Sequence, residues 1–176
     1  SMTLLVTASA GPTRGRLIFR GIEYKCAIGA GGVTDAKREG DQCTPLGTWP
    51  LQRVFYRPDR VDPPMTRLRL IAIDKSMGWS DDPSDAAHYN RLVSLPYGHG
   101  HEALWREDAL YDTVVELGYN DDPPVAGRGS AIFIHVARPD YASTQGCVAL
   151  SINALHQVLA MIESGETLTV SRANNP

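Results

Sequence analysis

The sequence predicts a mainly β, β-rich α+β fold with a few helices, built of curved mixed sheets or a β-sandwich, with a helix and a strand at its C-terminal end. Most segments alternate or are rich in β-branched and aromatic residues, and only one strong helical stripe is present. No internal repeat, heptad or linker interrupts the chain. Its length of 176 residues therefore fits one domain, residues 2–173, with Ser1 excluded as a tag remnant.

The predicted strands begin with a hairpin. Segment 15–29 reads "GRLIFRGIEYKCAIG", and Arg20-Gly21 stands where its turn would fall. Residues 75–100 are irregular and rich in turn-forming residues, so we expect an ordered loop that packs or carries function. The remaining predicted strands are 3–9, 46–57, 66–74, 111–119, 130–137 and 166–172.

Two helices are predicted. "HEALWREDAL" (residues 101–110) has the composition of a short helix. The clearer helix begins after Ser151, a good N-cap residue, and Gly165 is placed to end it. Its apolar stripe consists of Ile152, Leu155, Leu159 and Ile162.

Composition narrows the functional classes. The net charge is -3 and no basic block occurs, so nothing indicates a nucleic-acid partner. The longest apolar runs are far too short to span a bilayer. Residues 2–11 lack a basic n-region, so no clear signal peptide is predicted. Three widely spaced cysteines do not form a disulfide framework, although a Cys26–Cys43 bridge stays open, and no cofactor is predicted.

The strongest site candidates are Cys147 and His135. Gly146 lets the chain approach a ligand closely at Cys147, and backbone N–H groups of such a turn can stabilise an oxyanion. A thiol needs a neighbouring base to act as a nucleophile, and His135 ends the strand before this loop. A buried cysteine and a satisfied core histidine are the alternative interpretation. The polar loop "RPDYASTQGC" favours a surface cleft instead.

These residues carry a family resemblance. "IHVA" followed by "STQGCVAL" resembles the active-site motif of the L,D-transpeptidase catalytic domain (YkuD-like), in which a histidine precedes a Ser/Thr-His-Gly-Cys element. "EGDQCTPLGTWPL" resembles that family's upstream "TP.G" segment, and "GYNDDPPVAGRGSAIFIH" is similar to a divergent branch. The resemblance covers roughly residues 25–150.

The resemblance implies a fold and a chemistry. The fold would be of the L,D-transpeptidase type. Cys147 would attack a peptide carbonyl of a peptidoglycan stem peptide, with His135 as its base and the N–H groups of Cys147 and Gly146 at the oxyanion. The thioester would pass to an amine or to water, and carbapenem-type compounds would acylate the cysteine. Thr144 would orient His135 or line the pocket, and a cell-envelope or periplasmic location would follow.

Two positions depart from the common family pattern. Gln145 stands where a histidine precedes Gly-Cys, and Ala149 stands where an arginine follows two residues after the cysteine. The interval from histidine to cysteine is also shorter than usual. Substrate recognition therefore needs other residues, for which the candidates are Arg128, Arg138, Gln145, Tyr119 and Trp105.

Two alternatives stay open. The departures at Gln145 and Ala149 are compatible with a non-catalytic module that binds wall peptides or proteins on the same fold. "YGHGHEALW" offers His99 and His101 as weak candidates for zinc ligands of a peptidase, with Glu102 adjacent. Further acidic ligands for such a site would be Asp81, Asp82 or Asp108.

Overall fold

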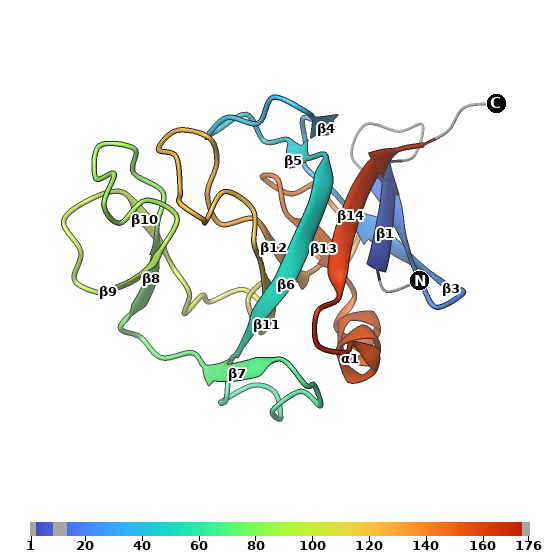
Figure 1. Ribbon diagram of the computed structural model, residues 1–176. Helices are drawn as coiled ribbons and strands as arrows, with labels where there is room; N and C mark the ends of the chain where they lie inside the picture. Colours follow the sequence, from blue (N-terminus) through green and yellow to red (C-terminus); the bar gives the residue numbers. More distant parts are fainter. Residues whose placement is uncertain (1–2, 9–13, 174–176) are drawn as a thin grey trace.

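A computed structural model describes residues 3–8 and 14–173; Ser1 and Met2 lie outside the described residues. The main sheet has the order β11-β12-β13-β3-β2-β1-β14-β6-β7, and β11 also pairs with β6. Eight of its strands therefore close into a ring, with β7 attached outside it (Figure 1). The strands are β1 (Thr3–Ala8), β2 (Arg14–Phe19), β3 (Ile22–Ala27), β6 (Gly47–Tyr56), β7 (Arg69–Ala72), β11 (Thr113–Leu117), β12 (Phe133–Val136), β13 (Val148–Leu150) and β14 (Thr167–Arg172).

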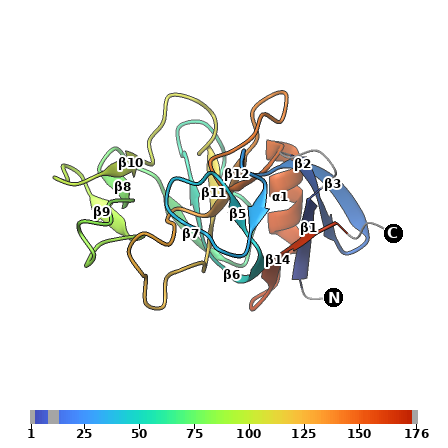
Figure 2. The ribbon, with the colours of Figure 1, turned by 90° about the horizontal axis from the view of Figure 1, so that it is seen from above.

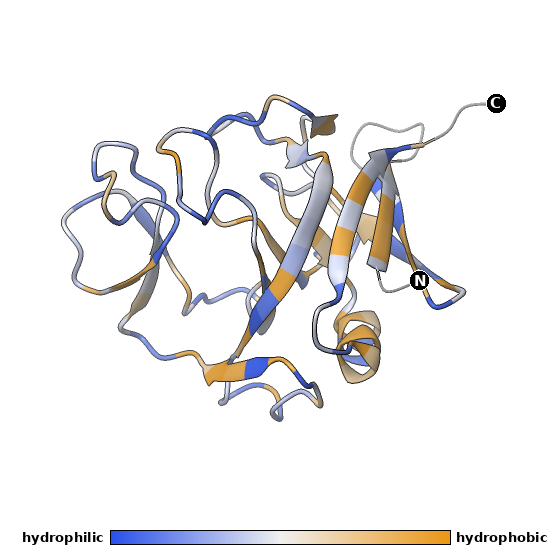
Figure 3. Ribbon diagram, in the orientation of Figure 1, coloured by the Kyte–Doolittle hydropathy of each residue, from blue (hydrophilic) through white to orange (hydrophobic). Residues whose placement is uncertain are grey.

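Side chains along the strands of the ring alternate between the buried interior and the outer surface. Along β14, Leu168 and Val170 are buried while the threonines beside them are partly exposed, and Figure 3 shows the same banding by hydropathy. The predicted hairpin is confirmed, because Arg20 and Gly21 join β2 to β3 with positive φ angles of 50° and 79°. Such a turn matches the twist of the two strands it connects.

One helix, α1 (Ile152–Met161), occurs in the described residues and confirms the predicted C-terminal helix. Ser151 is its N-cap, and its hydroxyl accepts a hydrogen bond from the Ala154 N–H at 3.1 Å. The helix ends at Met161, earlier than predicted, because Ile162 is already extended. Gly165, with φ +86°, instead belongs to the turn that leads into β14. Within the described part of the chain, no helix is long and apolar enough to cross a membrane.

The stretch expected to be irregular forms a small sheet. Strands β8 (Met77–Ser80), β9 (Leu92–Ser94) and β10 (His101–Ala103) pair in the order β10-β8-β9. The short helix predicted over residues 101–110 is therefore wrong, because residues 101–103 are committed to strand pairing with β8. Two short strands, β4 (Val33–Thr34) and β5 (Thr44–Pro45), pair in the glycine-rich loop.

Two hydrophobic clusters divide the interior. The larger fills the inside of the ring and includes the apolar face of α1. The smaller lies outside the ring, where β6, β11 and β12 face the small sheet, and it contains Phe133, Trp79 and Cys147. Figure 2 shows the small sheet at one end of the molecule and the ring with α1 at the other. All three cysteines are free, so the Cys26–Cys43 bridge is not formed.

Candidate active site

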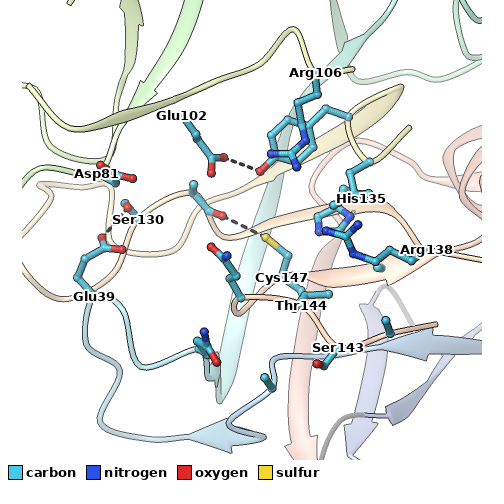
Figure 4. Close-up of a pocket in the computed structure, with 18 residues that line it drawn as sticks. Glu39, Asp81, Glu102, Arg106, Ser130, His135, Arg138, Ser143, Thr144 and Cys147 are labelled. Atoms are coloured by element: carbon cyan, nitrogen blue, oxygen red, sulfur yellow. Dashed lines mark hydrogen bonds between the residues drawn. The ribbon is translucent and has the colours of Figure 1, made fainter. Parts of the chain in front are cut away.

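A cavity of about 330 Å³ opens between the ring and the small sheet, and Figure 4 shows its lining side chains. Its walls come from the glycine-rich loop, the small sheet, the segment before β11, and the loop that joins β12 to β13. Its lining is mainly polar. The ionisable and nucleophilic residues are Glu39, Asp81, Glu102, Arg106, Tyr111, His135, Arg138 and Cys147.

Strand register places His135 and Cys147 on the same face. Strands β12 and β13 are parallel neighbours, with Ile134 opposite Val148 and His135 opposite Ala149. Successive side chains of a strand point to opposite faces. Ile134 and Val148 point into the ring, so His135 and Cys147 both point outward to the cavity that they line. The two predicted catalytic side chains therefore share one surface on adjacent strands.

The Cys147 thiol sits at the floor of this cavity and is 7% exposed. Its Sγ donates to the Ala131 carbonyl at 3.2 Å and accepts from the Phe133 N–H at 3.4 Å. Burial raises the pKa of the thiol to about 12, although the hydrogen bond from Phe133 acts in the opposite direction. The Cys147 thiol is therefore neutral at rest.

The His135 imidazole is neutral as well. Burial lowers its pKa to about 4. Its Nδ1 lies 2.9 Å from the Val136 carbonyl oxygen, and a carbonyl can only accept, so Nδ1 carries the proton. This tautomer leaves the lone pair on Nε2, which is the atom that can act as a base. The Tyr111 ring packs edge-on against the imidazole, with 5.7 Å between the ring centroids.

Thr144 organises the turn that carries the cysteine. Its hydroxyl donates to the Cys147 carbonyl at 2.7 Å and accepts the Gly146 N–H at 3.1 Å. Its backbone is hydrogen-bonded to Ile28 and Ala30 on the other side of the turn. The Gly146 N–H is thus already used by Thr144, which leaves the Cys147 N–H as the candidate oxyanion donor. Thr144 acts here on the turn, and no hydrogen bond joins it to His135.

Gly146 is required by the backbone itself. Its φ is +133°, and a Cβ at this position would lie 2.8 Å from the Cys43 carbonyl oxygen. The "TPLG" segment approaches from this side, where the buried Thr44 hydroxyl accepts the Gly29 N–H at 2.9 Å. The two motifs quoted from the sequence therefore meet at the cysteine.

The predicted substrate-binding residues separate into two groups. Arg138 and Gln145 line the cavity with Cys147. Arg128 and Tyr119 instead line a second hollow of about 390 Å³ beside Lys37. Trp105 lies under the Arg57 guanidinium, 3.7 Å from the ring centroid, and does not line either space.

The candidate zinc ligands do not gather into a metal site. His101 is on β10, and its Nδ1 lies 2.8 Å from the His99 carbonyl oxygen. The His99 ring lies 3.8 Å from Asp82 and 3.9 Å from Asp85. Across residues 3–8 and 14–173, no group of three or more histidine, cysteine or acidic side chains is arranged to hold a metal ion. The zinc-peptidase alternative gains no support from this geometry.

Sequence reasoning missed several residues of the cavity. Tyr111 and Arg106 line it, and the Arg106 guanidinium lies 5.1 Å from the centre of the Tyr111 ring. The sequence suggests Glu102 only as a metal ligand, whereas the structure shows that it accepts a hydrogen bond from the Tyr111 hydroxyl. Glu39 belongs to the upstream motif, which by itself does not place its side chain in this cavity. These residues come from separate segments, and no local pattern connects them.

Comparison with known proteins identifies the domain family of this chain. The family model for the L,D-transpeptidase catalytic domain (YkuD) matches residues 12–170. The chain belongs to this family. L,D-transpeptidases of this family act on peptidoglycan peptides. No curated protein and no solved structure gives a significant match to this L,D-transpeptidase domain.

Proposed function

We propose that the protein is a cysteine-dependent L,D-transpeptidase that acts on peptidoglycan stem peptides through a thioester acyl-enzyme. It releases a terminal D-amino acid and passes the acyl group to an amine or to water. The observation that carries this proposal is that His135 on β12 and Cys147, directly before β13, point to the same face and line one cavity. A cell-envelope location follows from this substrate.

The first half-reaction uses the neutral pair. Cys147 Sγ attacks the scissile carbonyl carbon while His135 Nε2 takes the thiol proton, so that the S–C bond forms as the carbonyl becomes an oxyanion. The Cys147 N–H donates to that oxyanion, a contribution of roughly 3 kcal/mol. When the intermediate collapses, the C–N bond breaks and the proton on Nε2 passes to the leaving amine. The carboxylate of the leaving D-amino acid is matched by Arg138, which lines the same cavity as Cys147.

Gln145 and Ala149, which replace two common family residues, are compatible with this reaction. Gln145 lines the cavity and offers a neutral amide where the common pattern has a histidine, so the base role belongs to His135 alone. Ala149 lies opposite His135 and also lines the cavity. The small Ala149 side chain leaves room at this position, and Arg138 and Arg106 supply the positive charge instead.

The test is covalent labelling with a carbapenem-type compound followed by intact-mass measurement. We expect one adduct on the wild type, none on Cys147→Ala, and an adduct that forms orders of magnitude more slowly on folded His135→Ala. Cys43→Ser is the matched control, because Cys43 is a half-buried thiol outside the cavity and its loss leaves labelling intact.

A non-catalytic module is the second candidate, and one observation favours it. The Cys147 thiol is nearly buried, and its pKa is raised to about 12. If the folded wild type forms no adduct but binds a peptidoglycan tetrapeptide, the binding module replaces the enzyme. An adduct that persists in Cys147→Ala would refute the role of this cysteine.

A further inference from the structure

Lys37 is a buried lysine that the proposed reaction does not use. It belongs to the glycine-rich loop, and its side chain is only 5% exposed. Its Nζ donates to the Asp41 carboxylate at 2.5 Å. The side chain lines the second hollow, beside Arg128, and does not line the cavity that contains Cys147. Lysine is rarely buried to this extent, so the surroundings of this side chain indicate what it does.

The side chain of Lys37 lies against two glycines from different loops. A Cβ on Gly129 would lie 3.0 Å from Lys37 Cγ and 3.1 Å from Cε, and a Cβ on Gly146 would lie 3.5 Å from Nζ. Both glycines have positive φ angles, +107° and +133°, which other residues adopt only with strain. The missing side chains of these two glycines therefore leave the space that the lysine fills.

The same two loops set the position of the nucleophile. Gly129 lies two residues before Ala131, whose carbonyl accepts the hydrogen bond from the Cys147 thiol at 3.2 Å. Gly146 directly precedes Cys147, and the peptide between them carries the N–H that is the candidate oxyanion donor. One buried side chain, Lys37, thus contacts both of the loops that orient the reacting groups.

Asp41 fixes the end of this side chain. Its carboxylate accepts hydrogen bonds from Lys37 Nζ and from the backbone N–H groups of Arg38 and Cys43. Burial acts to raise the pKa of Asp41, but these hydrogen bonds outweigh it and the pKa is lowered, so the carboxylate stays charged beside the ammonium. The Cys43 carbonyl oxygen also lies against Gly146, 2.8 Å from the position of a Cβ. The ion pair therefore connects the upstream motif to the turn that carries the cysteine.

We propose that Lys37 is a positioning residue for acylation, which holds both loops so that the thiol and the backbone N–H of Cys147 face the substrate carbonyl. This inference rests on the proposed function and adds to it a residue from outside the cavity. Lys37 acts through the two loops and not on the substrate. Its charge has a second effect: burial raises the pKa of the Cys147 thiol to about 12, and the nearby ammonium acts in the opposite direction.

The test is the kinetics of labelling by a carbapenem-type compound over a range of concentrations, followed by intact mass, on the wild type and on Lys37→Met. Methionine keeps an unbranched apolar stem but ends before the position of Nζ, so the contacts with Gly146 and Asp41 are lost. We expect the limiting rate to fall about 100-fold, as for a misplacement of roughly 1 Å, and the half-saturating concentration to stay within about twofold. Lys75→Met is the matched control, because it removes an exposed lysine from the turn before β8.

Asp41→Asn is the second variant, which decides the matter if Lys37→Met does not fold. It keeps the lysine and an acceptor for the Cys43 N–H, but removes the charge that holds Nζ, and we expect a limiting rate about tenfold lower. Simple destabilisation would reduce the fraction of molecules that become labelled and leave the limiting rate of the folded ones unchanged. A limiting rate equal to that of the wild type in the folded variant overturns the inference.

Hydrogen exchange of backbone amides, measured by NMR on the free protein, separates this failure from failure of the proposed function. The amides of Thr144 and Gly146 are hydrogen-bonded in the wild type. We expect the amides of residues 129–131 and 144–147 to exchange about tenfold faster in Lys37→Met, with those of α1 unchanged. If the wild type forms no acyl-enzyme but these amides respond, the proposed function fails and Lys37 still holds the loops. Unchanged exchange in both loops overturns the inference, whatever the labelling shows.

Discussion

Acylation of Cys147 is expected to be nearly independent of pH between about 5 and 9, because both reacting groups are neutral over this range. The pKa of His135 is lowered to about 4, so its lone pair is available above that pH and is lost to protonation below it. The rate should therefore fall tenfold per pH unit below about 4. The pKa of Cys147 is about 12, so the thiol itself does not titrate in this range.

The raised pKa of the Cys147 thiol sets the population of thiolate that is available for attack. A pKa raised from 9.0 to about 12 makes ionisation less favourable by about 4 kcal/mol. At pH 7 only about one Cys147 in 10⁵ is then a thiolate. Attack by a preformed thiolate would be slow at this population, so the proposed function requires that the proton move to His135 during the attack.

Two reagents distinguish attack by a preformed thiolate from attack in which the proton moves to His135. Iodoacetamide reports the thiolate itself, and its rate at Cys147 should rise tenfold per pH unit up to about pH 10 without a plateau. A carbapenem-type compound, held in the cavity beside His135, should show the flat profile. Both are measured by intact mass in a Cys43→Ser background, with Cys147→Ala as the control for labelling elsewhere. An iodoacetamide rate that levels off between pH 6 and 8 would show a thiolate–imidazolium pair at rest and refute this reasoning.

Three further predictions concern the framework. Gly146→Ala is expected to lose acylation and about 2 kcal/mol of stability, because its φ is +133° and its Cβ would meet the Cys43 backbone; a crystal structure with an unmoved turn would contradict this. Thr144→Val removes two hydrogen bonds of the turn, so denaturant unfolding should show about 2 kcal/mol lost, with slower acylation at unchanged pH dependence. Arg20→Ala leaves the buried Glu166 carboxylate without its partner and should cost about 2 kcal/mol, with acylation unaffected; unchanged unfolding would show the pair to be neutral.

Much of the fold was predictable because its signals are local. Ser151 caps α1 as its residue type and the following apolar stripe predict, and Arg20-Gly21 turns between two alternating segments. The false helix at 101–110 had helical composition, but pairing of residues 101–103 with β8 overrides that preference. The small sheet went unpredicted because its three strands are only three or four residues long and irregular segments separate them.

Only the part of the site that lies within one sequence motif could be predicted. His135, Thr144 and Cys147 come from two adjacent strands and the loop between them, so their grouping follows from one stretch of sequence. Glu102 and Tyr111 reach the cavity from the small sheet and the segment before β11, and only the folded chain brings them there. Arg128 is close to His135 in sequence, but it lies in the second hollow.

The order of strands in the ring has a consequence for biosynthesis. β14 (Thr167–Arg172) lies between β1 and β6, so the ring cannot close until the last described strand has left the ribosome. The loop that carries Cys147 is hydrogen-bonded to Ile28 and Ala30, which follow β3, the neighbour of β13 in the ring. The ring that supports this loop is therefore complete only when β14 has paired with both β1 and β6.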